Sequence, residues 1–220
     1  MASDSSHGFE IHRSVFKADE IGWMREEAEN LQTKTGSTCI RQLCRRSSRF
    51  DDLANDSRLL SLLPSDFQPV RSILFDKNHK ENWPVAWHQD LTISVRRRHH
   101  VDGYGPWSVK EGVAHVQPPI EVLERLSTLR IHIDDTSASN GALKVVPNTH
   151  ALGRLNATQI QVEVASGSTT CICGPGDVLQ MSPLILHSSS RSEKPAHRRV
   201  VHIEYAPPDA LPHPLSFYES

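Results

Sequence analysis

Two histidines and one aspartate are the residues of this chain whose types and spacing best suit a metal centre. His88 and Asp90 lie two positions apart in the run 82–95. Side chains two positions apart share one face of a strand, so this pair would direct an imidazole and a carboxylate to the same point. His187, which follows the apolar run 183–186, is a third donor of suitable type. Two histidines and one carboxylate on one face of a metal are the ligands of non-haem Fe(II) oxygenases, so these residues predict an oxygenase.

An arginine further along the chain strengthens this interpretation. A His-x-Asp pair alone is a weak signal in a chain with 13 histidines. Arg198, however, lies eleven positions after His187 and opens an alternating segment that continues to Tyr205. A guanidinium on a strand beside a metal can donate two parallel hydrogen bonds to a carboxylate. A dicarboxylic 2-oxo acid that chelates iron needs such an anchor for its far carboxylate.

With these residues in place, the sequence resembles the phytanoyl-CoA dioxygenase family of Fe(II)- and 2-oxoglutarate-dependent oxygenases over most of the chain. The matching pieces are Trp87-His88-Gln89-Asp90, Asp134-Asp135-Thr136, Asn140-Gly141-Ala142-Leu143, Val146-Pro147-Asn148-Thr149-His150 and Gly176-Asp177. The resemblance implies that His88, Asp90 and His187 bind iron. It also implies that Arg198 binds the distal carboxylate of 2-oxoglutarate, with Ser189 assisting.

The resemblance further implies an enzyme that uses Fe(II), O2 and 2-oxoglutarate to oxidise a small-molecule metabolite, releasing succinate and CO2. Hydroxylation is the expected outcome, because related halogenases have a small residue where this chain has Asp90. One position departs from the family. Arg130 stands eleven positions before Gly141, where many members carry a tryptophan. We therefore expect the carboxylate contacts of the co-substrate to differ here and to include Arg130.

Three further residues are candidates for substrate contacts, and each has a structural alternative. Lys77 follows an expected strand, 70–75, and is either solvated or close to an anion. Trp107 lies in a long connection after the ligand pair, and such connections often bind ligands. His132 shares one face of the expected strand 128–134 with Arg130, and this face lines either a ligand cavity or the solvent-exposed side.

Two other functions fit the same residues. A cupin-like protein could bind a metal or ligand through these three side chains without redox turnover. A metal-dependent oxygenase or isomerase that does not use 2-oxoglutarate is the second alternative, although it assigns no role to Arg198. Oxygen-dependent succinate release would separate the predicted enzyme from both.

Hydrophobic periodicity predicts a mainly β fold, a double-stranded β-helix of jelly-roll or cupin-like type with flanking helices. Helices are expected at 18–32, 57–63 and 121–126, and strands at 70–75, 128–134, 142–146, 159–164, 169–173, 178–181 and 198–205. Segments 33–52 and 96–119 lack periodicity and are expected to be loops or lids. The whole chain, 1–220, is expected to form a single domain.

Composition narrows the choice of partner and compartment. The formal net charge of −2 favours neither nucleic acid nor an anionic membrane surface, so a small-molecule substrate is expected. The polar start Met1 to Ser6 does not resemble a secretory signal, and no segment is apolar enough to span a membrane, which favours a cytoplasmic location. Cys171 and Cys173 share one strand face and are expected to pack in the core.

Overall fold

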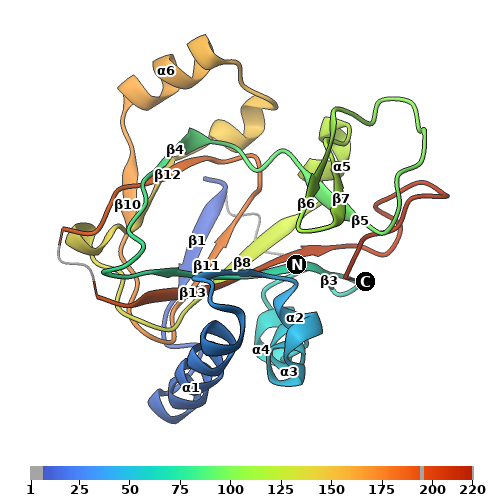
Figure 1. Ribbon diagram of the computed structural model, residues 1–220. Coiled ribbons are helices and arrows are strands. Elements are labelled where there is room, and N and C mark those ends of the chain that lie inside the picture. The colour runs from blue at the N-terminus through green and yellow to red at the C-terminus, as the bar shows by residue number, and fades with distance from the viewer. Residues whose placement is uncertain (1–6, 194–195, 220) are drawn as a thin grey trace.

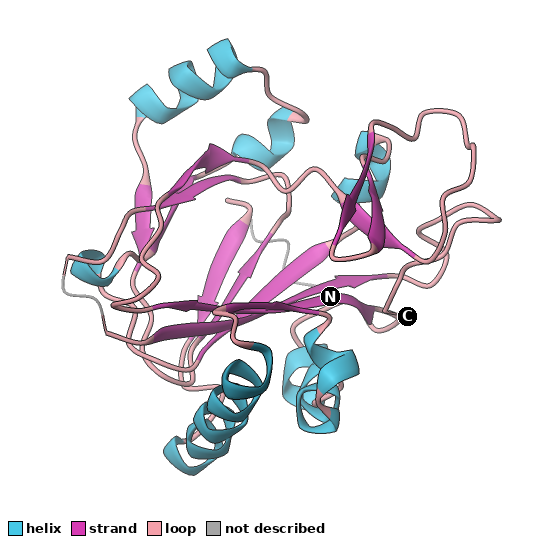
Figure 2. Ribbon diagram, in the orientation of Figure 1, coloured by secondary structure: helices cyan, strands magenta, loops and turns pink. Residues whose placement is uncertain are grey.

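The computed structural model describes residues 7–193 and 196–219, and it shows the β-rich fold that hydrophobic periodicity predicts (Figures 1 and 2). The segment Met1 to Ser6, predicted to be a non-secretory start, lies outside the described residues. The strands are β1 (Phe9–His12), β2 (Cys39–Arg41), β3 (Gln68–Lys77), β4 (Val85–His88), β5 (Ile93–Val95), β6 (Trp107–Lys110), β7 (Val113–Val116), β8 (Ser127–His132), β9 (Leu143–Val146), β10 (Thr169–Cys171), β11 (Val178–Met181), β12 (Leu186–Ser189) and β13 (Arg198–Ala206).

These strands form antiparallel sheets. A six-stranded sheet has the order β1-β11-β8-β13-β3-β2, and a four-stranded sheet has the order β10-β9-β12-β4. Figure 1 shows the smaller sheet facing one side of the larger one. A third sheet, β5-β7-β6, stands at the end of this pair. The jelly-roll prediction is therefore confirmed, and the space between the two larger sheets is where inward-facing side chains of both meet.

Helices cover the other side of the large sheet. The longest, α1 (Ala18–Thr35), buries Ile21, Met24, Ala28 and Leu31 as its periodicity predicts. The remaining helices are α2 (Leu43–Arg46), α3 (Ser48–Ala54), α4 (Ser57–Leu60), α5 (Ile120–Glu124), α6 (Ala157–Ser166) and two 3-10 turns, Ala138–Asn140 and Thr149–Leu152. Figure 1 places α1 to α4 together against the outer face of the large sheet. Within the described ranges, no helix is both long and apolar enough to cross a bilayer.

A buried ion-pair network fastens α1 to the large sheet. Arg199 on β13 is 4 % exposed, and its Nε donates to Asp134 Oδ2 at 2.7 Å while its Nη1 donates to Glu29 Oε1 of α1 at 2.7 Å. Arg25 of α1 donates to the other oxygen of Asp134 at 3.0 Å. Asp134 thus receives hydrogen bonds from two arginines on two different elements.

Replacing Asp134 by alanine should destabilise the fold strongly. The change leaves the Arg199 guanidinium buried with only Glu29, and removing one partner of a buried pair costs about 3–5 kcal/mol. Urea unfolding would measure the loss in the free energy of unfolding. The neighbouring Asp135 is exposed, so Asp135→Ala should stay within about 0.5 kcal/mol of the parent protein. Equal losses in the two variants would contradict this role for Asp134.

Two segments expected to be loops contain regular structure instead. The segment 33–52 holds the end of α1, strand β2, helix α2 and most of α3. Ser47 begins α3 by accepting a hydrogen bond from the backbone of Phe50, a capping arrangement that composition alone did not reveal. The segment 96–119 is irregular only in its first part, because β6 and β7 form a hairpin. Glu111 and Gly112 turn this hairpin with φ angles of 50° and 78°.

The expected strand 159–164 is also wrong, since this segment lies within helix α6. Asn156 caps the helix, and Gln159 bonds back to the Asn156 backbone, which completes a capping box. Ile160 and Val164 are one helical turn apart and both pack on the cluster around Val146. The predicted burial of Cys171 and Cys173 is confirmed, because both are 0 % exposed.

Candidate metal centre

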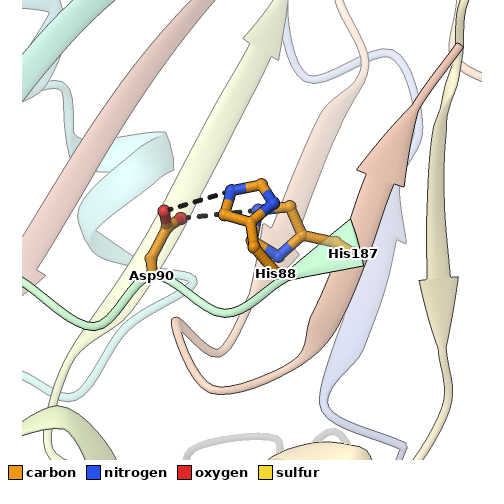
Figure 3. Close-up of side chains that lie close together, drawn as sticks. All are labelled: His88, Asp90 and His187. Carbon is orange, nitrogen blue, oxygen red and sulfur yellow. Dashed lines mark ion pairs between the residues drawn. The ribbon is translucent and has the colours of Figure 1, made fainter. Parts of the chain in front are cut away.

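The three predicted ligands come together between the sheets, two from adjacent strands and one from the segment that follows the first of them. His88 ends β4, and its Cα lies opposite that of His187 on β12. Strand β4 stops before Asp90, whose backbone N–H donates to Pro183 O at 2.9 Å. Figure 3 shows the Asp90 carboxylate facing the two imidazole rings.

The donor atoms converge on one point. Asp90 Oδ1 lies 3.7 Å from His88 Nε2, and Asp90 Oδ2 lies 3.6 Å from His187 Nε2. One ligand atom from each residue can be chosen so that all three lie within 4.8 Å of one another. Metal–ligand distances near 2 Å place donors of one ion about 3–4 Å apart, so this spacing suits a single ion.

Backbone contacts set which ring nitrogen of each histidine faces the centre. His88 Nδ1 lies 2.8 Å from Ala86 O, and His187 Nδ1 lies 2.9 Å from Ile185 O. A carbonyl oxygen only accepts hydrogen bonds, so each Nδ1 carries the proton and donates it. Each neutral ring then has its lone pair on Nε2, the nitrogen that faces Asp90, which is the usual way a protein orients metal-binding histidines.

Electrostatics favour the protonation states that a cation needs. Burial lowers the pKa of His187 to about 4, which keeps its ring neutral at physiological pH. Burial raises the pKa of Asp90, but His187, which is protonated below about pH 4, and the other positive charges nearby more than offset this effect and hold the pKa at about 2. An ionised carboxylate and a neutral imidazole are the forms that bind a divalent metal. The donor set therefore fits Fe(II) with positions left open.

Gln89, between two of the predicted ligands, fixes the ligand segment in place. It is 7 % exposed, and its amide nitrogen donates to Gly153 O at 2.8 Å and to Leu184 O at 2.7 Å. Its amide oxygen accepts from the backbone N–H of Leu155 at 2.9 Å. These three hydrogen bonds tie the segment between His88 and Asp90 to two distant loops.

A cavity of about 200 Å³ opens beside the three residues. Strand β3 supplies one wall through alternate residues: Arg71, Ile73, Phe75 and Lys77. The neighbouring strand β13 supplies Arg198, His202 and Glu204, which share one face as their even spacing predicts. Trp83 and Val85 add an apolar wall beside the metal centre.

One end of this cavity holds two cations that form no ion pair with any of the described residues. Lys77 is 1 % exposed, and its Nζ donates to Ser189 Oγ at 2.7 Å and to Ser190 O at 2.8 Å. Arg198 is 3 % exposed, and its Nη1 donates to Gly141 O at 2.7 Å while its buried Nε has no partner. Burial, together with the charges of Arg198 and Arg130, lowers the pKa of Lys77 to about 7. Buried charges of one sign require a counter-ion, so this end suits an anionic group.

A chain of hydrogen bonds links Arg130 to Arg71 along the cavity wall, through His202 and Glu204. Arg130 Nη1 donates to His202 Nδ1 at 2.9 Å, since a guanidinium only donates. The His202 proton is then on Nε2, which donates to Glu204 Oε1 at 3.3 Å. Arg71 Nη1 donates to the same oxygen at 2.8 Å. These hydrogen bonds hold a neutral imidazole and a carboxylate between two guanidinium groups on the cavity wall.

Two of the residues expected to contact substrate lie away from this cavity. Trp107 on β6 packs against the apolar cluster around Val116, with Arg98 over its ring at 5.5 Å. His132 is 1 % exposed and bonds Thr136 Oγ1 at 2.9 Å, although its neighbour on the same strand face, Arg130, lines the cavity. Trp83 lines the cavity and was missed, because no periodic strand in the sequence contains it. Arg71 was also missed, although its even spacing from Lys77 was a usable signal.

Solved structures of low sequence identity share this fold. AviO1 from Streptomyces viridochromogenes is 22 % identical, with 95 % of this chain and 94 % of that chain covered and a TM-score of 0.69. EctD from S. alaskensis, with 2-oxoglutarate and 5-hydroxyectoine, is 17 % identical over 93 % and 74 %, with a TM-score of 0.73. The epimerase SnoN of nogalamycin biosynthesis, in complex with Fe3+, alpha ketoglutarate and nogalamycin RO, is 16 % identical over 93 % and 80 %, with a TM-score of 0.73.

Sequence comparison is more specific than these structural matches. No curated protein is significantly similar to this chain in sequence. The family model described as phytanoyl-CoA dioxygenase matches residues 5–200, a range that contains the three converging donors and Arg198. With most of the chain matched and the jelly-roll fold in place, this protein belongs to the phytanoyl-CoA dioxygenase (PhyH) family.

Proposed function

We propose that this protein is an Fe(II)- and 2-oxoglutarate-dependent dioxygenase that hydroxylates a small-molecule metabolite within a single catalytic domain. The observation that carries the proposal is that a metal-binding arrangement and an anion-binding end lie in one cavity. Two histidines present Nε2 toward one carboxylate, and the adjoining cavity ends at two buried cations for which the described part of the chain offers no ion-pair partner. Membership of the PhyH family supports the same activity.

His88, Asp90 and His187 are the residues that would hold the iron. Bound iron would supply the oxidising chemistry, by activating O2 at the expense of the 2-oxo acid, which leaves as succinate and CO2. The side chains of this protein contribute orientation. The carbonyls of Ala86 and Ile185 fix the two ring planes, and Gln89 fixes the segment that carries Asp90.

Arg198, Lys77 and Ser189 are the residues that we assign to the distal carboxylate of 2-oxoglutarate. All three line the same end of the cavity, and neither cation forms an ion pair with a carboxylate of the described residues. Arg130 lines the cavity nearby and is 7 % exposed, and its Nη1 donates to His202. We assign it to the other carboxylate of the co-substrate, because it lines the same cavity as the three candidate metal ligands.

The test is an anaerobic titration of the purified protein with Fe(II) and then with 2-oxoglutarate. Chelation of iron by the 2-oxo acid should produce a visible charge-transfer band, and succinate should form when oxygen is admitted with substrate. Bound iron without this band would reject the proposal and favour a metal enzyme that does not use 2-oxoglutarate. A band without any oxygen-dependent succinate would favour a binding protein.

The affinity for 2-oxoglutarate should depend on pH through Lys77. The pKa of Lys77 is lowered to about 7 in the empty cavity, and a bound carboxylate raises it again because it stabilises the ammonium form. Binding therefore takes up a proton above pH 7, and the dissociation constant should rise by up to about tenfold per pH unit there. Below pH 7 Lys77 is already charged, so the affinity should be nearly constant.

Calorimetric titrations from pH 6 to pH 9 would measure this dependence. Lys77→Met should bind 2-oxoglutarate more weakly and with a flatter pH profile. The exposed Lys80 provides the matched control, and Lys80→Met should keep the parent profile. An unchanged slope in Lys77→Met would assign the proton uptake to another group.

A further inference from the structure

The cavity has a second end, opposite the one assigned to the co-substrate. On the paired strands β3 and β13, Lys77 lies opposite Arg198 and Arg71 lies opposite Glu204, six residues further along each strand. At about 3.3 Å per residue, the two pairs are roughly 20 Å apart along the sheet. The carbon chain of 2-oxoglutarate spans only roughly 5 Å, from four carbon–carbon bonds of about 1.5 Å. A co-substrate anchored at Arg198 therefore leaves the Arg71 end to another molecule.

The charges around the cavity do not balance. Its described lining carries four cationic side chains and two carboxylates, namely Arg71, Lys77, Arg130 and Arg198 against Asp90 and Glu204. An Fe(II) ion would add two positive charges and a 2-oxoglutarate dianion would add two negative charges. The excess of positive charge therefore remains when both are bound. Even with Lys77 neutral, one positive charge stays unmatched. A low-dielectric cavity with this excess attracts an anion.

More cationic groups gather at the Arg71 end. A small hollow adjoins the cavity there and shares Arg71 and Ile73 with it. Lys110, at the end of β6, lines this hollow and forms an ion pair with none of the described residues. Arg41 also lines it; its Nη1 pairs with Glu111 at 2.7 Å, but its buried Nε has no partner.

The acidic groups at this end are already engaged. Glu204 Oε1 accepts from Arg71 and His202. Glu219 lines the hollow but accepts from the backbone N–H and the hydroxyl of Ser72. Lys110 and Arg71 line the same hollow, and Arg71 also lines the cavity that contains the three candidate metal ligands. The two side chains can therefore hold one end of a substrate that extends into the cavity.

We propose that the substrate is an organic anion whose carboxylate or phosphate group is bound by Lys110 and Arg71, with its reacting carbon directed toward the metal centre. This inference rests on the proposed function and names the substrate class for the same site. Lys110 supplies a free ammonium group, and Arg71 supplies the guanidinium nitrogens that Glu204 does not use. The apolar wall of Ile73 and Trp83 would face the carbon skeleton between the two ends.

The first test compares butyrate with butyramide, which have the same shape and differ in charge. Calorimetry on the anaerobic protein loaded with Fe(II) and 2-oxoglutarate would give both affinities. Butyrate should bind about tenfold more tightly or better, as expected for one charge-assisted contact. Lys110→Met should remove this preference and Lys110→Arg should keep it. The exposed Lys34, on α1, provides a control variant, Lys34→Met, which should behave like the parent.

A second test measures turnover with a mixture of natural metabolites. A bacterial metabolite extract would be separated on an anion exchanger at pH 7, and each fraction would be incubated with the loaded enzyme. Succinate release should follow the retained, anionic fraction. Succinate release from the unretained fraction alone would overturn the inference. So would equal affinity for butyrate and butyramide, or no binding of butyrate, in protein that shows the iron and 2-oxoglutarate band. Absence of that band would instead reject the proposed function itself.

Discussion

Replacing His187 by alanine is expected to abolish productive iron binding. His187 is 3 % exposed, and its Nε2 faces the Asp90 carboxylate at 3.6 Å. Loss of a residue that merely orients a ligand costs 10–100-fold in metal affinity, so loss of a ligand should cost more than about 100-fold. Iron titration of the anaerobic protein, followed by the 2-oxoglutarate band, would measure both effects.

His100→Ala is the matched control for this experiment. Its ring is 99 % exposed, so the change removes a histidine without touching the cavity, and iron affinity should be unchanged. Far-UV circular dichroism would show whether each variant is folded. A folded His187→Ala protein that keeps the band would remove this residue from the ligand set.

The carboxylate ligand allows an independent check. Asp90→Ala should lose turnover by more than about 100-fold for the same reason, although its backbone hydrogen bond to Pro183 stays in place. Full iron-dependent turnover in this variant would make the ligand assignment wrong. Asp90→Asn separates charge from shape, because the amide keeps the size of the side chain but removes the negative charge next to the two histidines.

The candidate site could be predicted from sequence to the extent that chemistry is local. His88 and Asp90 are two positions apart, so their proximity follows from backbone geometry alone. His187 could be named as a donor of suitable type, but its place beside this pair could be inferred only from the family resemblance, because nothing local shows that β12 lies beside β4. The Arg71 end of the cavity depends on the register of β3 against β13, which sequence periodicity does not define.

The errors in secondary structure have a common physical origin. Segment 159–164 alternates polar and apolar residues like a strand, but an N-terminal capping box at Asn156 and the one-turn spacing of Ile160 and Val164 stabilise a helix. In 33–52 the helices are short, and packing of Leu43 and Phe50 into the core determines them. In both places, capping and packing contacts that the alternation of residue types does not show determined the helices.

Arg198→Ala is expected to weaken 2-oxoglutarate binding by about 30-fold or more. Truncating one partner of a buried charged hydrogen bond costs about 2–5 kcal/mol, and 1.4 kcal/mol corresponds to a tenfold change. The Arg198 guanidinium donates to Gly141 O at 2.7 Å. This hydrogen bond fixes the orientation of the guanidinium group in the cavity. Titration of the iron-loaded protein would give the dissociation constant.

The adjacent arginine makes this prediction specific. Arg199 lies on the opposite face of β13, where it bonds Asp134 and Glu29 instead of lining the cavity. Arg199→Ala should therefore lower the free energy of unfolding and leave the 2-oxoglutarate affinity of the folded protein unchanged. Arg198→Lys should recover only part of the affinity, because a lysine keeps the charge but cannot donate two parallel hydrogen bonds. Unchanged affinity in Arg198→Ala would transfer the anchor to Lys77, the other cation at this end of the cavity, or to the nearby Arg130.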